Sequence, residues 1–260
     1  MSILVFENVT ITFGGITALL NVGFSVEKGE LYALIGPNGA GKTTVFNCIN
    51  GLYRPSRGRV FFEGSEITNL KCHQIAELGV ARTFQNIALF KHMTVTDNLL
   101  LGCHHLMKTG VLAGGIFFFK AVREEMEKRR RVEEIIKFLE IEPYRKAIVG
   151  NLSYGIQKRV ELGRALAMEP KVLLLDEPAS GMNVEETEDI ARFIIDLKEI
   201  GQTMLLVEHD MGVVMDIADR IGVLNFGEKI AEGTPKEIQN NPHVIEAYLG
   251  ETQLLAEVQA

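Results

Sequence analysis

The chain contains few cysteines, and they form no pattern. Cys48, Cys72 and Cys103 are far apart, include no C-x-x-C pair and are odd in number. This usage argues against a disulfide framework and is typical of a chain kept in a reducing cytosol. The sequence therefore predicts that packing, and not covalent cross-linking, holds the fold together.

Long apolar runs and an excess of basic charge are also missing. A membrane-spanning helix needs about 18 or more consecutive apolar residues. The longest apolar window, residues 111–119, is much shorter and contains two glycines. The first residues have neither the basic segment nor the apolar core of a signal peptide, so we expect a chain that does not cross a membrane but can lie against one. A net charge of −7 makes nucleic acid an unexpected partner.

One basic run, residues 128–131, does tempt a nucleic-acid interpretation. Acidic residues precede its bases at helical spacing, as Glu125 precedes Arg129. Opposite charges four residues apart stabilise an exposed helix face. We therefore expect a solvated, self-paired helix here.

The length and the order of patterns indicate one α/β domain. The 260 residues, of which 47% are hydrophobic, can bury a sizeable core. Short apolar runs alternate with helix-like segments, which predicts a parallel sheet. The expected strands of this sheet are residues 31–35, 171–175 and 203–207, and the expected helices are 42–50, 154–168, 184–200 and 211–218. The intervening region from about 97 is helical in character.

The first functional motif follows the strand expected at 31–35. Residues 36–44 read GPNGAGKTT and satisfy G-x-x-x-x-G-K-[ST] between a strand and a helix. The glycines let successive N–H groups point at phosphate oxygens. Lys42 would reach the β- and γ-phosphates, and the Thr43 hydroxyl would ligate Mg²⁺. We expect nucleotide contacts from every residue of this phosphate loop, namely Gly36, Pro37, Asn38, Gly39, Ala40, Gly41, Lys42, Thr43 and Thr44.

Two acids follow the apolar run at 171–175. Ligands bind at the carboxyl ends of strands in open α/β sheets. Asp176 would hold magnesium there, and Glu177 would polarise the attacking water. Alone, the two acids could equally begin a helix; beside Lys42 and Thr43 the catalytic interpretation is favoured. These motifs still leave open kinases, small GTPases, helicases and many ATPases.

The order of the remaining motifs narrows this choice. Gln85 ends VARTFQ, Leu152 begins LSYG, Ser180 begins SGMN, and His209 lies in LVEHD. Each is weak alone, but together and in this order they resemble the ATP-binding-cassette (ABC) family over essentially the whole chain. Phe13 is placed like the aromatic residue that stacks on adenine in that family.

The resemblance implies a fold and a division of the chain. It implies a P-loop NTPase α/β core with a parallel sheet, an N-terminal antiparallel β subdomain and an inserted α-helical subdomain. The core would comprise residues 1–96 and 169–260 of a single nucleotide-binding domain spanning 1–260. Residues 97–168 would form the helical subdomain, which ends in the signature helix.

The resemblance also implies roles around ATP and Mg²⁺. Glu177, His209 and Gln85 would be catalytic, and Gln85 would also ligate the metal. Two cassettes of this family face head to tail, so that Ser153 and Gly155 would grip the γ-phosphate held by the partner's phosphate loop. Loss of that phosphate on hydrolysis would release the two surfaces.

The signature segment departs from the common LSGGQ form. Tyr154 replaces the first glycine of the pair, a substitution seen in some amino-acid-import cassettes. Ile156 stands where the motif has glutamine, and Gln157 follows one place later. Ser153 and the Gly155 amide are retained.

Within the family, the chain most resembles the ATP-binding subunit of branched-chain (hydrophobic) amino-acid import systems. The matching stretches are FGGITAL at 13–19, ARTFQN at 81–86, MTVTDNL at 93–99, ASGMN at 179–183, AEGTP at 231–235 and VIEAYLG at 244–250. One departure is Val184, where that subfamily usually has proline. The resemblance implies integral-membrane permease subunits, a second ATPase subunit of the same or a related chain and, indirectly, a periplasmic or extracellular solute-binding protein. It places the chain on the cytoplasmic face of the membrane.

Three alternatives remain open. Lipopolysaccharide-export cassettes share a similar tail but lack the FGG opening and the ARTFQN stretch. Soluble ABC ATPases of the translation-factor or DNA-repair kind usually carry two cassettes or a long coiled-coil insertion. A P-loop kinase would leave Ser153, Gln85 and His209 unexplained.

Apolar residues gather just after Gln85. Ile87, Leu89, Phe90 and Met93 are followed by the apolar window at 111–119. A large exposed apolar patch usually marks a partner site, so we predict a docking surface for the permease. The alternative is that these side chains fill the core of the helical subdomain.

A cysteine and two histidines, Cys103-His104-His105, invite a metal interpretation. They lack the spacing that usually marks a zinc site. We expect surface or interface residues here and no metal other than magnesium.

Overall fold

The computed structural model describes residues 1–103 and 118–248, and only the backbone of residues 118–124. In chain order its elements are β1 (Ser2–Phe13), β2 (Ile16–Glu27), β3 (Leu31–Ile35), α1 (Lys42–Ile49), β4 (Arg57–Phe62), β5 (Ser65–Glu66), α2 (Cys72–Leu78), β6 (Val80–Arg82), α3 (Val95–Gly102), α4 (Phe118–Phe138), the short 3-10 helices Glu142–Tyr144 and Val149–Asn151, α5 (Tyr154–Leu166), β7 (Val172–Asp176), α6 (Val184–Glu199), β8 (Thr203–Val207), α7 (Met211–Ile217), β9 (Arg220–Asn225), β10 (Glu228–Gly233) and α8 (Pro235–Gln239).

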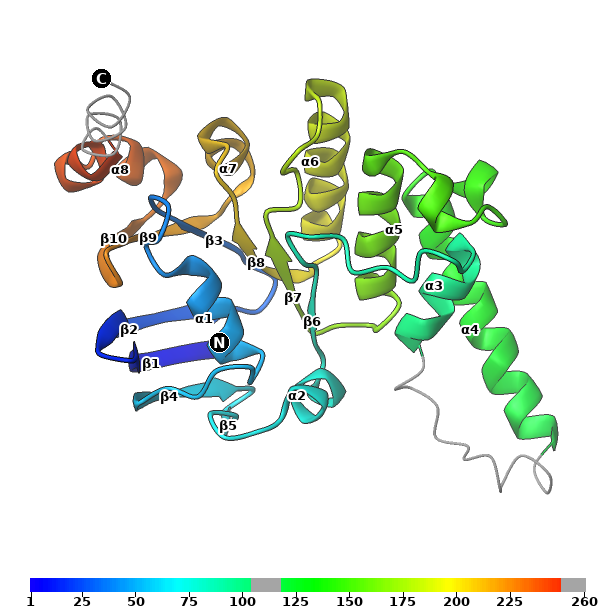
Figure 1. Ribbon diagram of the computed structural model, residues 1–260, viewed down its shortest axis with the longest axis horizontal. Coiled ribbons are helices and arrows are strands. Elements are labelled where there is room, and N and C mark those ends of the chain that lie inside the picture. The colour runs from blue at the N-terminus through cyan, green and yellow to red at the C-terminus, as the bar shows by residue number, and fades with distance from the viewer. Residues whose placement is uncertain (104–117, 249–260) are drawn as a thin grey trace.

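Two sheets organise the described part of the chain. A four-stranded antiparallel sheet has the order β2-β1-β4-β5, and a six-stranded sheet has the order β10-β9-β3-β8-β7-β6. In the larger sheet β10 is antiparallel to β9, and the other five strands are parallel. Helix α1 lies between the two sheets (Figure 1). The predicted α/β fold class is confirmed.

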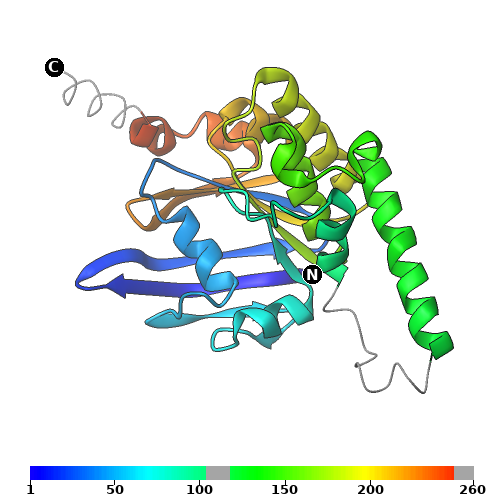
Figure 2. The same ribbon diagram turned by 45° about the vertical axis from the view of Figure 1, so that its right-hand side comes forward.

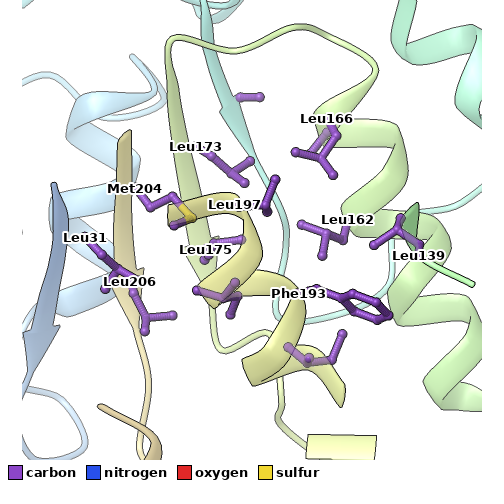
Figure 3. Packing of buried hydrophobic residues seen from close by; sticks show 14 of the residues in the cluster. Leu31, Leu139, Leu162, Leu166, Leu173, Leu175, Phe193, Leu197, Met204 and Leu206 are labelled. Carbon is purple, nitrogen blue, oxygen red and sulfur yellow. The ribbon is translucent and has the colours of Figure 1, made fainter. Parts of the chain in front are cut away.

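Alternation along the central strands divides the core into two clusters. In β3, Tyr32 and Leu34 pack with α1 and the antiparallel sheet, whereas Leu31 and Ile35 pack with the helices on the opposite face. The side-chain period of two in a strand produces this division. Figure 3 shows the second layer, where leucines of β3, β7 and β8 meet side chains of α5 and α6 such as Phe193. Both faces of the larger sheet are therefore buried, which explains why its strands are continuous apolar runs.

Helices α3, α4 and α5 lie together at one end of the larger sheet (Figures 1 and 2). Helix α4 buries Val132 and Ile136 and exposes its charged face. On that face Arg129 pairs with Glu125, as predicted, and Arg131 pairs with Glu134. None of the helices in the described residues is both long and apolar enough to span a bilayer.

Two expectations about apolar and thiol residues change with the structure. Leu89 is buried in the core cluster and Ile87 packs against it, so these two residues do not form an exposed surface. Cys103 is also buried, and burial raises the pKa of its thiol. His104, His105 and most of the window 111–119 lie outside the described residues.

Candidate functional site

The phosphate loop joins the carboxyl end of β3 to the amino end of α1. Gly36 has φ 149°, and a Cβ there would lie 2.1 Å from the Leu224 carbonyl oxygen. Gly41 has φ 107°, and its Cβ would meet the Leu19 side chain at 2.6 Å. Both glycines are therefore required, because a larger residue would be strained and would also clash. At these two glycines the loop is packed tightly against β9 and β2.

Lys42 places its ammonium inside the curl of this loop. Its Nζ donates to the Gly36 carbonyl at 2.6 Å and to the Pro37 carbonyl at 3.0 Å. Thr43 is exposed at the first turn of α1, where the backbone N–H groups of a helix have no partner within the helix. A cation, a hydroxyl and a helix N-terminus at one point fit the β- and γ-phosphates of a nucleotide with its metal.

Asp176 ends β7 and is buried. Its carboxylate accepts from Arg82 Nη2 at 2.6 Å, and the same guanidinium donates to Asn47 of α1 at 2.7 Å. The Arg82 guanidinium also lies 5.4 Å from the Phe46 ring centre and 5.2 Å from the Phe84 ring centre. Arg82 thus fixes the expected metal ligand relative to the helix of the phosphate loop. The sequence signal for this role was a charged residue inside a short buried strand, and it was missed.

Glu177 lies just beyond Asp176 with both carboxylate oxygens engaged. Gln85 Nε2 donates to Oε2 at 2.7 Å, and His209 Nε2 lies 2.6 Å from Oε1. Glu177 is 7% exposed and has φ 48°, a conformation that non-glycine residues seldom adopt. Its N–H donates to the Val207 carbonyl at 2.8 Å, which ties the turn to β8. Strain at a buried acid held from two sides is typical of a functional site.

Glu208 holds the turns around this acid, and sequence reasoning missed it. Its Oε1 accepts from the Ala179 N–H and its Oε2 from the His209 N–H, both at 2.9 Å. Burial raises the pKa of Glu208, although these backbone donors act in the opposite direction. A glutamate placed directly after an apolar strand was the available signal. Its contacts place His209 and the turn at Ala179 beside Glu177.

The signature segment begins α5 as the sequence predicts. Ser153 is the N-cap, and its Oγ accepts from the Ile156 N–H at 3.4 Å. The Ile156 side chain packs against the core, while Gln157 Nε2 donates to the Leu152 carbonyl at 2.8 Å. The departure at Ile156 therefore leaves the helix start capped.

The same segment contacts the turn after Glu177 within one chain. The Tyr154 hydroxyl donates to the Ser180 carbonyl at 3.1 Å, and its ring lies against Gly181. A Cβ on Gly155 would lie 2.2 Å from a carboxylate oxygen of Glu186 at the start of α6. The Tyr154 side chain points towards Ser180 and Gly181. It therefore leaves the space in front of the first turn of α5 unfilled, although it replaces a glycine.

The structure brings some predicted residues together and leaves others apart. Glu177 contacts Gln85 and His209, whereas no contact joins Ser153 to the phosphate loop among the described residues. Phe13 ends β1, is 43% exposed and packs edge-on against Tyr53 at 5.0 Å. Its role towards adenine stays a prediction.

Comparisons with known proteins identify the family of the chain. The model of the ABC transporter family matches residues 19–180, and that of the branched-chain amino acid ATP-binding cassette transporter matches residues 228–252. A relative from Pseudomonas aeruginosa, the high-affinity branched-chain amino acid transport ATP-binding protein BraF, is 45% identical over 96% of this chain and 98% of its own.

Solved structures give the same result. An ATP-binding cassette of an ABC transporter in its ADP conformation is 37% identical, with a TM-score of 0.83 over 96% of this chain and 99% of that one. A dimeric bacterial ABC transporter cassette is 29% identical, with a TM-score of 0.76 over 89% of this chain and 98% of that one. The family model covers more than half of the chain, and Glu177, Gln85 and His209 meet in one cluster of the structure. The chain therefore belongs to the ABC transporter family, as an ATP-binding cassette that hydrolyses ATP.

Proposed function

We propose that this chain is the ATP-hydrolysing subunit of an importer for branched-chain or other hydrophobic amino acids. It would work on the cytoplasmic face of the membrane with separate permease subunits and, indirectly, with a periplasmic or extracellular solute-binding protein. The observation that carries the ATPase is the engagement of both Glu177 oxygens by Gln85 and His209. The substrate class rests on the named function of the P. aeruginosa relative and on the C-terminal family match.

The residues of the site divide the work on the nucleotide. The loop amides and Lys42 would bind the β- and γ-phosphates, and Phe13 would stack on the base. Thr43, Asp176 and the Oε1 atom of Gln85 would hold Mg²⁺. Hydroxyl, carboxylate and amide oxygens are ligands that this hard cation prefers. When bound, the metal would neutralise charge that develops on the phosphate oxygens.

Glu177 would orient the attacking water and accept a hydrogen bond from it. Its two contacts fix the carboxylate plane, so little reorganisation is needed when the water is polarised. His209 contacts Glu177 and would also contact the γ-phosphate. We infer that these residues act as one unit, whose effects on rate do not add.

A second cassette would complete each site. Ser153 and Gly155 begin α5, and their contacts within this chain go to α5 itself and to the start of α6. A helix N-terminus with a serine cap is suited to an anion, and a dimeric cassette of the family has been solved. We infer a head-to-tail pair in which residues 153–155 of each chain face the partner's phosphate loop. Residues 97–168 would move as the helical subdomain within that pair.

The substitution Glu177→Gln tests the assignment of the ATPase. It removes the carboxylate that orients water but keeps an oxygen that can accept hydrogen bonds. We expect MgATP to bind normally, hydrolysis to fall at least about a hundredfold, and the chain to shift from monomer to dimer on a sizing column. The exposed substitution Glu185→Gln on α6 is the matched control. Turnover close to that of the control would contradict the role of Glu177.

We infer a smaller docking surface for the permease than the sequence predicts, because Ile87 and Leu89 pack in the core. It retains only the residues that are exposed. Phe90 is 56% exposed and Met93 is half-buried, close in sequence to Gln85. Motion of a docked permease would therefore reach Gln85 through a short stretch of chain, which is a physical route for coupling.

Aspartate at Phe90 and Met93 tests this surface. We expect the double variant to fold and to keep basal ATPase, and to lose transport in vesicles reconstituted with the permease subunits. The control is Ile200→Asp, which should transport normally. Ile200 follows the last residue of α6 and is 78% exposed. Full transport by the double variant would refute the assignment.

A further inference from the structure

Helix α5 carries two opposite charges into the protein interior. Lys158 and Glu161 are three residues apart, their side chains are 2% and 1% exposed, and Nζ lies 3.5 Å from Oε2. Two buried ions are costly to desolvate, and hydrophobic residues of similar volume are often as stable. Stability alone therefore does not account for the pair.

The polar atoms of this pair bind the backbone of an irregular loop. Residues 83–90 form neither helix nor strand, so their N–H and C=O groups need other partners. Lys158 Nζ donates to the carbonyls of Phe84 and Gln85 at 3.0 and 2.9 Å, and Glu161 Oε1 accepts from the Ala88 N–H at 3.2 Å. The loop that carries Gln85 is thus held by side chains of the signature helix.

The other side of this loop contacts Glu177 directly and Asp176 only through Arg82. Gln85 Nε2 donates to Glu177, and the Phe84 ring covers the guanidinium of Arg82, which binds Asp176. Phe84 and Gln85 therefore have carbonyls bound to α5, while the Gln85 side chain binds Glu177 and the Phe84 ring lies against Arg82. A displacement of these carbonyls therefore also displaces the side chains, because both belong to the same residues.

Ser153 caps the same helix that carries the pair. Lys158 lies five residues beyond the cap, about 7.5 Å along a rigid rod. A shift of the helix start therefore moves Lys158 and Glu161 by nearly the same distance. Their hydrogen bonds then move the Gln85 loop.

We propose that Lys158 and Glu161 are positioning residues that make the placement of Gln85 depend on the position of the signature helix. The inference rests on the proposed two-cassette function, in which Ser153 binds the nucleotide of the partner while Gln85 serves the nucleotide of its own chain. Occupation of one site then alters the other, and by linkage the effect is reciprocal. The pair is a physical connection between the two ATP sites, beside the hydrogen bond that Arg164 of the same helix donates to the Ala88 carbonyl.

The test replaces the pair by Lys158→Met/Glu161→Leu, which keeps volume and leaves no single buried charge. We expect the fold and nucleotide affinity to persist. The Hill coefficient of hydrolysis should fall from about two to about one. Hydrogen exchange at the Ala88 amide, measured without nucleotide, should rise roughly tenfold because its acceptor is gone.

The control is Arg159→Met on the same helix. Arg159 binds Asp189 of α6 and does not contact the Gln85 loop, so its Hill coefficient should equal that of wild type. If the double variant fails to fold, Lys158→Gln/Glu161→Gln keeps a donor and an acceptor of different reach, and the same reduction in cooperativity is expected.

Three results would overturn the proposal, and they are distinguishable. A folded pair variant with wild-type cooperativity would show that the pair only supports the structure, as would lower thermal stability with an unchanged Hill coefficient. Unchanged exchange at Ala88 would show that the loop is held elsewhere. A wild-type Hill coefficient of one would overturn the two-site function itself, and the coupling with it.

Discussion

The buried ion pair between Arg82 and Asp176 allows a quantitative prediction. The two side chains are 6% and 4% exposed, and their atoms approach to 2.6 Å. The substitution Arg82→Met leaves Asp176 buried without its cation. Removing one partner of a buried pair destabilises a protein by about 3–5 kcal/mol.

We therefore expect the free energy of unfolding to fall by about 4 kcal/mol. A typical domain is stable by about 5–15 kcal/mol, so the variant should fold but unfold at clearly lower urea concentration. The assay is equilibrium unfolding in urea, followed by circular dichroism, without nucleotide and at a fixed pH.

A matched control exists on the surface of the antiparallel sheet. Arg59 pairs with Glu7 at 3.0 Å and covers the Phe61 ring at 5.2 Å, but the paired side chains are 56% and 43% exposed. Arg59→Met makes the same chemical change in water, where such pairs contribute about 0–1 kcal/mol. The contrast between the two variants isolates the effect of burial.

A second substitution separates the charge from the packing. In Arg82→Met/Asp176→Asn the uncompensated charge is gone, so about 2 kcal/mol of the loss should be recovered. The reasoning is refuted if Arg82→Met costs no more than Arg59→Met, or if Asp176→Asn restores nothing in the Arg82→Met background.

Two further predictions concern α5. Ser153→Arg should leave ATP affinity of the monomer nearly unchanged and abolish cooperative hydrolysis, because the added bulk and charge would block the partner's site; a large loss of affinity in the isolated chain would mean that Ser153 acts within its own chain. Burial raises the pKa of Glu161 above its usual 4.5, although Lys158 and Arg164 lower it, so the folded chain keeps this proton where the unfolded chain has lost it. The stability from this group is present below pH 4.5 and is lost as pH rises through the native pKa. Glu161→Gln should therefore flatten the decline of unfolding free energy as the pH rises above 4.5. Urea titrations in which wild type and variant differ by the same amount at every pH would contradict this.

The sequence determined those features of the protein that depend on interactions between residues close together in the chain. The phosphate loop is a strand, a glycine-rich turn and a helix in direct succession, so its motif can be recognised from residues within a dozen positions. The N-cap at Ser153 is equally local, since its hydroxyl binds an N–H three residues later. The apolar runs of β3, β7 and β8 indicate strands buried on both faces, and their alternation with helices indicates a parallel sheet. For the same reason the acids after β7 could be placed at the carboxyl edge of the sheet.

Only the tertiary structure decided which of these residues meet. Gln85 and Glu177 are 92 positions apart, and the strand order that places β6 beside β7 brings them together. Leu89 shows the limit of a pattern near the site, because an apolar residue after Gln85 is equally suited to a surface for a partner and to the core, and it lies in the core.

Buried charge is the clearest case of what the sequence could not determine. The residue types of Arg82, Lys158 and Glu161 usually lie at the surface, so the sequence alone predicts that these charges are solvated. Their burial depends on partners supplied by distant segments: Asp176 for Arg82, and the backbone of the Gln85 loop for the pair on α5. A charge leaves water only where such partners compensate its desolvation, and the positions of those partners are fixed by the packing of the whole fold.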